Sequence, residues 1–366
     1  MWKTSEGSTG RLLQLCFGYF FFYVVTGVVV RYFQFYPGGP QLNNIEYLVY
    51  STTGGASLAL IVVLILRWYK FETIRPTKLL GIVFPSEFYY IAPAGFCTAI
   101  IIATTTLMYS IKGVSVMVAM VLMRASVIII GRIVDAIQIH QGILKKKVYL
   151  EENMGILFAL LAVSVKMFWS LFTVNTKDFD FLVHPAAMAI LCTYIAAYAI
   201  RIYIMNYFKN TRPKGVKLNN KSYFAIEQIF SCIVLVIAAV VIFYWPTNLG
   251  GGIDQIQEFH NAIANASSWW LWAIIGGTAF GIVAFFSVFI FMFKGRTATF
   301  AGLVNRLTSL LAGTTATLIS WVFLKGGFPE IQDWLSLVFI IVAIGFISVG
   351  ERRRIRELVV AHEVKK

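Results

Sequence analysis

Ten long apolar runs, separated by short polar links, constrain the fold of this chain more than any other feature. Each run has roughly twenty residues, and at about 1.5 Å per helical residue this is enough to cross a hydrocarbon core of about 30 Å. Since 58% of the residues are hydrophobic and only 13% are charged, a soluble fold could not bury the apolar surface. The sequence therefore predicts an all-α polytopic membrane protein with ten transmembrane helices. The expected runs are 11–33, 46–68, 87–110, 114–137, 153–174, 185–206, 223–245, 268–293, 297–323 and 333–350.

The basic residues of the links predict the orientation in the membrane. Links expected on one side hold 22 lysines and arginines, whereas those on the other side hold only Lys112, Lys177 and Lys325. Basic links stay in the cytoplasm, so both termini are expected to be cytoplasmic, in a bacterial inner membrane or an equivalent membrane. This placement explains most of the net charge of +14 and argues against a nucleic-acid partner. The basic tail, 351–366, is suited to contact anionic lipid headgroups.

The second half of the chain repeats features of the first half. The segment 112–131 matches 294–313 without a gap, and a lone arginine, Arg124 or Arg306, stands at the same position in each. Further matches at one constant offset join Tyr19 and Tyr23 to Tyr194 and Tyr198. The chain is therefore expected to consist of two five-helix repeats, 1–174 and 185–350. Because five is odd, the second repeat must enter the membrane inverted, which is the construction of many secondary transporters.

These features together resemble the drug/metabolite transporter superfamily. The resemblance is carried by ten spans in a five-plus-five inverted repeat, very short links at 111–113 and 294–296, and basic inner links. It covers nearly the whole chain. It implies a secondary transporter, similar to metabolite exporters and to nucleotide-sugar and triose-phosphate transporters, with the fourth and ninth helices lining the pore.

Arg124 and Arg306 are the leading candidates for a binding site. Each is expected near the middle of the bilayer, where an arginine costs about 2.5–3.5 kcal/mol even on the most lenient scale. No acidic residue is expected at that depth, and a guanidinium presents a planar fork of donors suited to phosphate or carboxylate. We therefore predict that the two arginines bind an anion jointly. The structural alternative is that each arginine bonds carbonyl groups or an acid on a neighbouring helix.

Other residues are weaker candidates for the same site, and each has a structural alternative. Lys166 could add to the anion site or extend its amine to the outer interface. The four matched tyrosines could line the cavity or only pack, and hydroxyl residues could bond carbonyls of their own helices. Arg31 and Arg201 are expected to snorkel from near the helix ends. The predicted substrate-binding set is Arg124, Arg306, Lys166, Tyr19, Tyr23, Tyr194, Tyr198, Ser115 and Thr297.

Three acidic residues are candidates for gating or coupling. Asp135 could form a local gate, but an i, i+3 pair with Arg132 is the favoured interpretation. Glu87 and Glu227 could bind a coupling proton or pair with Arg201, and the sequence does not separate these two roles.

The remaining polar residues do not suggest enzyme chemistry. The four cysteines and four histidines have no spacing typical of a metal site or a catalytic triad. No phosphate-binding motif of an ATPase is present, so we expect neither a cofactor nor a metal.

The predicted function is therefore a secondary transporter of a small anionic solute, a phosphate- or carboxylate-bearing metabolite such as a nucleotide-sugar-like compound. Its expected partners are that substrate and membrane lipids, and the protein is expected to be a monomer or a homodimer. One alternative is a proton-coupled exporter of amino acids or drugs. Another is a protein that handles lipid phosphates, for example a flippase.

Overall fold

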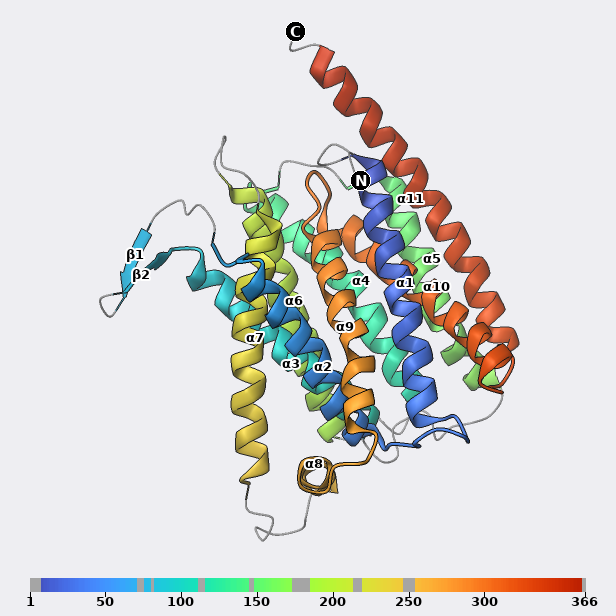
Figure 1. Cartoon of the computed structure of the whole chain (residues 1–366). Helices are drawn as coiled ribbons and strands as arrows, with labels where there is room; N and C mark the ends of the chain where they lie inside the picture. Colours follow the sequence, from blue (N-terminus) through green and yellow to red (C-terminus); the bar gives the residue numbers. More distant parts are fainter. Residues whose placement is uncertain are drawn as a thin grey trace.

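The computed structural model describes residues 8–70, 76–79, 82–110, 116–144, 148–172, 185–212, 219–245 and 254–363. This part of the chain forms a bundle of long helices with one short helix and one small hairpin (Figure 1). The long helices are α1 (Thr9–Gln34), α2 (Asn44–Ile65), α3 (Phe88–Ser110), α4 (Val116–His140), α5 (Leu150–Phe172), α6 (Pro185–Thr211), α7 (Asn220–Phe243), α9 (Trp270–Phe291), α10 (Ala298–Phe323) and α11 (Ile331–Glu363). Each coincides with one of the predicted apolar runs to within a few residues, apart from the C-terminal end of α11.

Seven of the described helices, α1, α2, α3, α6, α7, α9 and α11, are long and apolar enough to cross a membrane. Large apolar side chains on their outer surfaces are exposed, for example Phe17 at 68%, Val236 at 62% and Ile341 at 60%. A soluble protein does not expose so much contiguous apolar surface, whereas lipid covers it at no cost. The chain is therefore a multi-pass α-helical membrane protein.

Helices α4 and α10 carry charged and amide side chains within the bundle. Helix α10 contains Asn305, Arg306 and a series of threonines, and it packs against α1, α4, α5, α9 and α11. Helix α4 carries Arg124, Arg132 and Asp135 and packs against α5, α6 and α10. A helix surrounded by other helices needs less apolar surface than one that faces lipid.

Glycines set the spacing between two pairs of helices. A Cβ added at Gly54 of α2 would lie 1.9 Å from the Ile274 carbonyl oxygen of α9. Conversely, a Cβ added at Gly277 of α9 would lie 2.3 Å from the Ser51 carbonyl oxygen of α2. On α3, a Cβ at Gly95 would lie 2.6 Å from the Glu227 carbonyl oxygen of α7. Small residues allow backbones in membranes to approach this closely, and dispersion attraction between the closely packed helices then holds them together.

Both described chain ends lie at the same end of the bundle, which we call the terminal end (Figure 1). The antiparallel hairpin β1 (Pro76–Leu79) and β2 (Ile82–Pro85) projects sideways from this end of the molecule. At the opposite end, helix α8 (Asp254–Ala264) lies across the bundle axis. The Tyr50 hydroxyl donates to the Ala262 carbonyl oxygen at 2.8 Å and so ties α8 to α2.

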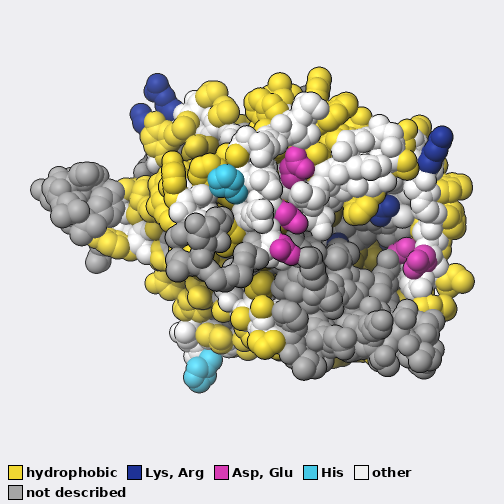
Figure 2. All heavy atoms as spheres, turned by 90° about the horizontal axis from the view of Figure 1, so that it is seen from below, with side chains coloured by type: hydrophobic (Ala, Val, Ile, Leu, Met, Phe, Trp, Pro, Cys, Tyr) yellow, Lys and Arg dark blue, Asp and Glu magenta, His cyan; other side chains and the backbone are white. Residues whose placement is uncertain are grey.

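The view onto the opposite end shows apolar side chains around the rim and acidic side chains near the middle, beside the grey residues (Figure 2). The acidic residues of the helices at this end include Glu46 at the start of α2, and Asp254 and Glu258 of α8. Figure 2 shows few basic side chains on the part of this face that is described.

Candidate functional site

Arg306 is the buried cation around which the candidate site is built. It lies eight residues after the start of α10, about 12 Å along the helix axis, and is only 9% exposed. Its guanidinium carbon lies 5.2 Å from the ring centre of Tyr198. Within the described part of the chain, Nε and Nη2 of Arg306 have no hydrogen-bond partner.

Four tyrosines from α1 and α6 surround this guanidinium. Tyr19 and Tyr23 are one turn apart on α1, with ring centres 5.5 Å apart, and Tyr194 and Tyr198 repeat the arrangement on α6 at 4.9 Å. All four interact electrostatically with Arg306. The spacing of four puts each pair on one helix face, and those faces meet because α1 packs on α10 and α6 packs on α4.

Arg124 completes the set on the α4 side. It lies eight residues after the start of α4 and is half-buried. The hydroxyl of Tyr194 donates to the carbonyl oxygen of the preceding residue, Met123, at 3.4 Å, and Tyr19 interacts electrostatically with both arginines. We call Arg124, Arg306 and these four tyrosines the arginine–tyrosine cluster. The structure thus gathers six of the predicted binding residues around one place between the two halves.

Asn305 and Ser287 extend the cluster and were not among the predicted residues. The Tyr19 hydroxyl donates to Asn305 Oδ1 at 3.4 Å, and Asn305 Nδ2 donates to Ser287 Oγ at 2.9 Å. Asn305 is 2% exposed. An asparagine beside the lone arginine of an apolar run was a usable signal, because a buried amide needs partners and marks a polar interior.

The cluster carries two positive charges, Arg124 and Arg306, and no carboxylate of the described residues forms an ion pair with either of them. The predicted structural alternative, an acid on a neighbouring helix, is therefore not what this part of the structure contains. Two guanidinium groups lie among tyrosine hydroxyls and ring faces, and Arg306 has two nitrogens without a partner among the described residues, an arrangement suited to hold a small anion.

A buried ion pair lies next to the cluster. Arg201 of α6 donates from Nε to Glu227 Oε1 at 2.6 Å and from Nη2 to Oε2 at 3.3 Å. Thr98 of α3 lies 2.9 Å from the same Oε1. Arg201 is 6% exposed and Glu227 is fully buried, so the prediction that Arg201 snorkels is wrong. Arg201 lies about 15 Å from the C-terminal end of α6, and the carboxylate of Glu227 offsets the cost of burying its charge there.

Several predicted residues lie away from the cluster. Glu87, just before α3, pairs with Arg212 at 3.0 Å and not with Arg201. Arg31 donates to the Thr317 hydroxyl at 2.8 Å, so this predicted snorkelling residue also binds within the bundle. Ser115 lies outside the described residues, and so does the side chain of Lys166, whose backbone belongs to α5.

Asp135 and Thr297 both act at the first turn of α10. The two Asp135 oxygens accept from the backbone amides of Ala298 at 2.8 Å and Thr299 at 2.7 Å. The Thr297 hydroxyl accepts from the Phe300 amide at 3.1 Å. The predicted pair of Asp135 with Arg132 is therefore wrong, because the partially positive N-terminus of α10 binds the carboxylate instead. Thr297 lies about 13 Å along the helix from Arg306 and serves as the helix cap.

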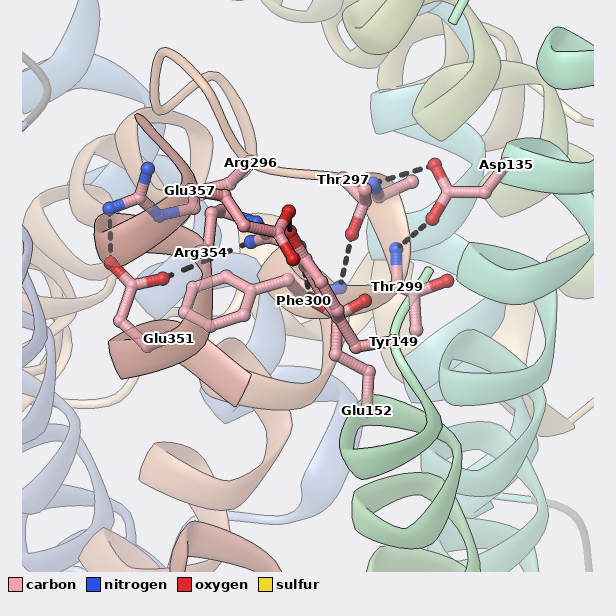
Figure 3. A network of polar contacts seen from close by, with 11 residues as sticks. Asp135, Tyr149, Glu152, Arg296, Thr297, Thr299, Phe300, Glu351, Arg354 and Glu357 are labelled. Atoms are coloured by element: carbon pink, nitrogen blue, oxygen red, sulfur yellow. Dashed lines mark hydrogen bonds and ion pairs between the residues drawn. The ribbon is translucent and has the colours of Figure 1, made fainter. Parts of the chain in front are cut away.

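A network of ion pairs covers this part of the terminal end (Figure 3). Arg296 pairs with Glu351, and Arg354 pairs with Glu152 and lies 3.8 Å from Glu351. All four residues are at most 6% exposed. We call these four residues the terminal-end network. It joins the start of α5, the start of α10 and the C-terminal part of α11.

Two contacts extend the terminal-end network. The Thr9 hydroxyl at the start of α1 donates to Glu351 Oε1 at 3.2 Å. The Tyr149 hydroxyl donates to Glu357 at 2.6 Å, and burial together with the Glu357 carboxylate raises the pKa of Tyr149, which keeps this hydroxyl protonated. These bonds explain why α11 continues to Glu363, where the sequence predicted a tail after 350.

Comparison with known proteins adds the fold alone. No protein-family model matches the chain, and no curated protein matches it. A solved structure titled "Crystal structure of protein" is similar, with a TM-score of 0.55 and 11% identity, over 94% of this chain and 99% of that chain. The arrangement of helices therefore has a counterpart that extends over nearly the full length of both chains.

Proposed function

We propose that this protein is a secondary transporter of a small anionic organic solute that bears a phosphate or carboxylate group. The observation that carries the proposal is the buried guanidinium of Arg306, which lies among four tyrosines and has two nitrogens without a hydrogen-bond partner in the described part of the chain. An unpartnered buried cation costs free energy in the empty protein, so its presence is understandable when a ligand supplies the negative charge. The tyrosine hydroxyls add donors, and their rings add flat faces for the organic part of the solute.

We also propose that ten helices span the membrane, as two inverted repeats, 1–174 and 185–350. The packing pattern supports this assignment. Helix α1 packs on α9 and α10, and its counterpart α6 packs on α3 and α4; likewise α2 packs on α9, and its counterpart α7 packs on α3. Exchanging each helix for its counterpart leaves this pattern unchanged, as a two-fold relation requires.

Two glycine contacts support the same relation at the level of residues. Gly277 approaches the backbone of Ser51, and Gly95 approaches the backbone of Glu227. The offsets that align the two halves pair Gly95 with Gly277 and Ser51 with Glu227. The same close approach therefore occurs in both halves at matching positions.

In this proposal the structure represents a state closed at the terminal end, which the basic links assign to the cytoplasm. At that end a Cβ on Gly131 of α4 would lie 3.0 Å from the Ala298 carbonyl oxygen of α10. The matching glycine on α10, Gly313, has no described atom within 4 Å of such a Cβ. Transport by alternating access would open the Asp135 contact and the terminal-end network and close the opposite end of α4 and α10.

The proposal is tested with purified protein in detergent, through thermal unfolding with sulfate, inorganic phosphate, citrate and uridine monophosphate. At least one anion is expected to stabilise the wild type. Arg306→Gln should weaken that effect by ten- to a hundredfold in affinity, since charged hydrogen bonds are worth about 1.5–3 kcal/mol each. Arg306→Lys should restore it only in part, because lysine keeps the charge and loses the planar fork.

Arg353→Gln is the matched control, since Arg353 is an exposed arginine of α11. It should respond to the anion as the wild type does. The best anion is then followed into proteoliposomes by uptake. If no anion stabilises the wild type and none is taken up, or if Arg306→Gln responds like Arg353→Gln, the proposal does not hold.

A further inference from the structure

The arginine–tyrosine cluster and the Arg201–Glu227 pair meet at one residue, Tyr198. Its ring lies under the guanidinium of Arg306, and Tyr198 interacts electrostatically with both Arg306 and Arg201. Arg201 follows Tyr198 by three residues, so it projects from the same face of α6. The guanidinium of Arg201 therefore lies beside the proposed anion site, where it is paired with the Glu227 carboxylate.

We infer that Arg201 is a reserve cation for the anion site, and that Glu227 takes up a proton when the anion draws Arg201 away. This inference rests on the proposed function and adds the coupling ion to it. In the empty protein Arg201 and Glu227 neutralise each other. An anion beside Tyr198 competes with Glu227 for the Arg201 guanidinium. Glu227, left without a counter-charge in a fully buried position, then becomes neutral by protonation, because an unpaired buried carboxylate is strongly disfavoured.

The charges and protons of this exchange balance. One O–H bond forms on the Glu227 carboxylate, and its proton comes from the solvent. The negative charge that Glu227 loses is replaced by that of a monovalent anion, so the net charge of the site does not change. The expected mechanism is therefore electroneutral symport of a monovalent anion with a proton.

Thr98 is suited to stabilise either form of Glu227. Its hydroxyl lies 2.9 Å from Glu227 Oε1 and also 2.9 Å from the Ala94 carbonyl oxygen of its own helix. A hydroxyl carries one proton, so it can donate to only one of these acceptors at a time. With Glu227 ionised, Thr98 can donate to the carboxylate. With Glu227 protonated, it can donate to Ala94 and accept from the acid.

The other described polar groups that interact with Glu227 or its partners are an arginine, a cysteine and tyrosines. Arg201 and Tyr198 face this region from α6, Cys97 and Tyr90 from α3, and Tyr223 from α7 itself, while α9 presents the apolar ring of Phe285 to Phe224. Within the described residues the buried Tyr223 hydroxyl has no hydrogen-bond partner. It is therefore available to donate to Glu227 or to pass a proton towards it.

The pair exists in only one half of the chain. The offsets that align the halves put Thr26 opposite Arg201 and Ser51 opposite Glu227. Both hydroxyls bond to carbonyl groups of their own helices, Thr26 to Phe22 at 2.9 Å and Ser51 to Leu48 at 3.3 Å. An ionic pair that one repeat has and the other lacks is dispensable for the shared packing, which favours a role in coupling.

The test measures proton uptake when an anion binds. Purified protein in weak buffer with a pH indicator is mixed with sulfate or benzenesulfonate, two anions that do not themselves titrate over the assay range. The wild type should take up a proton for each benzenesulfonate bound. Glu227→Gln should bind the anion and take up none. Glu46→Gln, which changes a glutamate at the start of α2 that bonds to Tyr50, should behave as the wild type.

A double variant, Arg201→Gln with Glu227→Gln, guards against poor folding of Glu227→Gln, because it leaves no unpaired charge. It should bind benzenesulfonate about tenfold more weakly than the wild type, with no proton uptake. If the wild type binds an anion without taking up protons, or if Glu227→Gln still takes them up, the inference is overturned while the anion site stands. If no anion binds to the wild type, the proposed function itself fails.

Discussion

Arg201 and Arg306 are both buried guanidinium groups of the bundle interior, but their surroundings give them opposite effects on stability. Arg201 has a bidentate carboxylate partner, whereas Arg306 lies among tyrosines, and two of its nitrogens have no partner among the residues that the structure describes. Removing Arg201 leaves a buried carboxylate without a counter-charge. Removing Arg306 removes a buried cation, and with it the desolvation free energy that this cation costs the protein when no anion is bound.

A comparison of single variants tests this difference. Arg201→Gln is expected to lower the free energy of unfolding by about 3–5 kcal/mol, because it leaves Glu227 unpaired. Arg306→Gln is expected to change it little or to raise it. Thermal or denaturant unfolding in detergent, without added anion, measures both. Equal destabilisation by the two changes would mean that Arg306 is a packing residue.

Asp135→Asn is a second prediction at the residue scale. An amide side chain has one oxygen and no charge, so one of the two bonds to the α10 backbone is lost and the other is weakened. The expected cost is about 1.5–3 kcal/mol, the size of a charge-assisted hydrogen bond. Unfolding measurements would show it, with Arg132→Gln as the control, since Arg132 does not bind this carboxylate. A comparable loss in Arg132→Gln would contradict this assignment.

The partners of individual polar residues were the part of the site that sequence could predict least. The matched offsets predicted which arginines and tyrosines would come together, because a repeat brings equivalent residues to equivalent places. The partner of Asp135 is a backbone amide more than 160 residues away in the chain, and no side-chain pattern encodes a backbone donor. A pair of Glu227 with Arg201 was one of the two predicted roles of this glutamate, and the structure contains that pair.

At the scale of elements, the contact of α2 with α9 depends on glycines whose Cβ would overlap the facing backbone. Gly277→Val is expected to destabilise the protein by several kcal/mol or to prevent folding, because backbones must separate to admit the side chain. Gly345→Val in α11 is the matched control, since no described atom lies within 4 Å of a Cβ there. Yield of folded protein and thermal unfolding would be compared. Similar behaviour of the two variants would mean that the close approach is not needed.

Hydrophobic patterning predicted the long helices well and the short elements poorly. A run long enough to cross a bilayer is strongly specified, because every backbone polar group in lipid must be bonded within its own helix. Helix α8 has eleven residues and was predicted as part of a loop. The hairpin at 76–85 was also missed, since four-residue strands leave little periodicity to detect. Helix α11 passes its predicted end because Glu351 and Arg354 find buried partners there.

On the scale of the whole molecule, the symmetry of the sequence does not predict the asymmetry of the structure. The proposed pair of inverted repeats would allow α4 and α10 to touch at either end of the bundle. The choice of the terminal end depends on residues that the repeat does not duplicate, among them Asp135 and the terminal-end network.

Disulfide formation between introduced cysteines would test this asymmetry. In a variant without the four native cysteines, the pair Gly131→Cys and Ala298→Cys should crosslink readily. The matching pair at the opposite end, Gly313→Cys and Val116→Cys, should crosslink slowly. Adding Arg354→Gln should slow the first pair and speed the second, because it weakens the closed terminal end. Equal rates for the two pairs, unaffected by Arg354→Gln, would contradict a closed terminal end.

The position of Glu351 and Arg354 near the C-terminus also has a consequence for the synthesis of the protein. A ribosome adds these residues after the other described long helices, so Arg296 and Glu152 remain without these partners until α11 has been made. A chain that still lacks α11 therefore has these two charges at the terminal end without their ion-pair partners. The ion pairs of the terminal end can therefore form only once α11 has been made, so this end of the bundle is the last to be assembled.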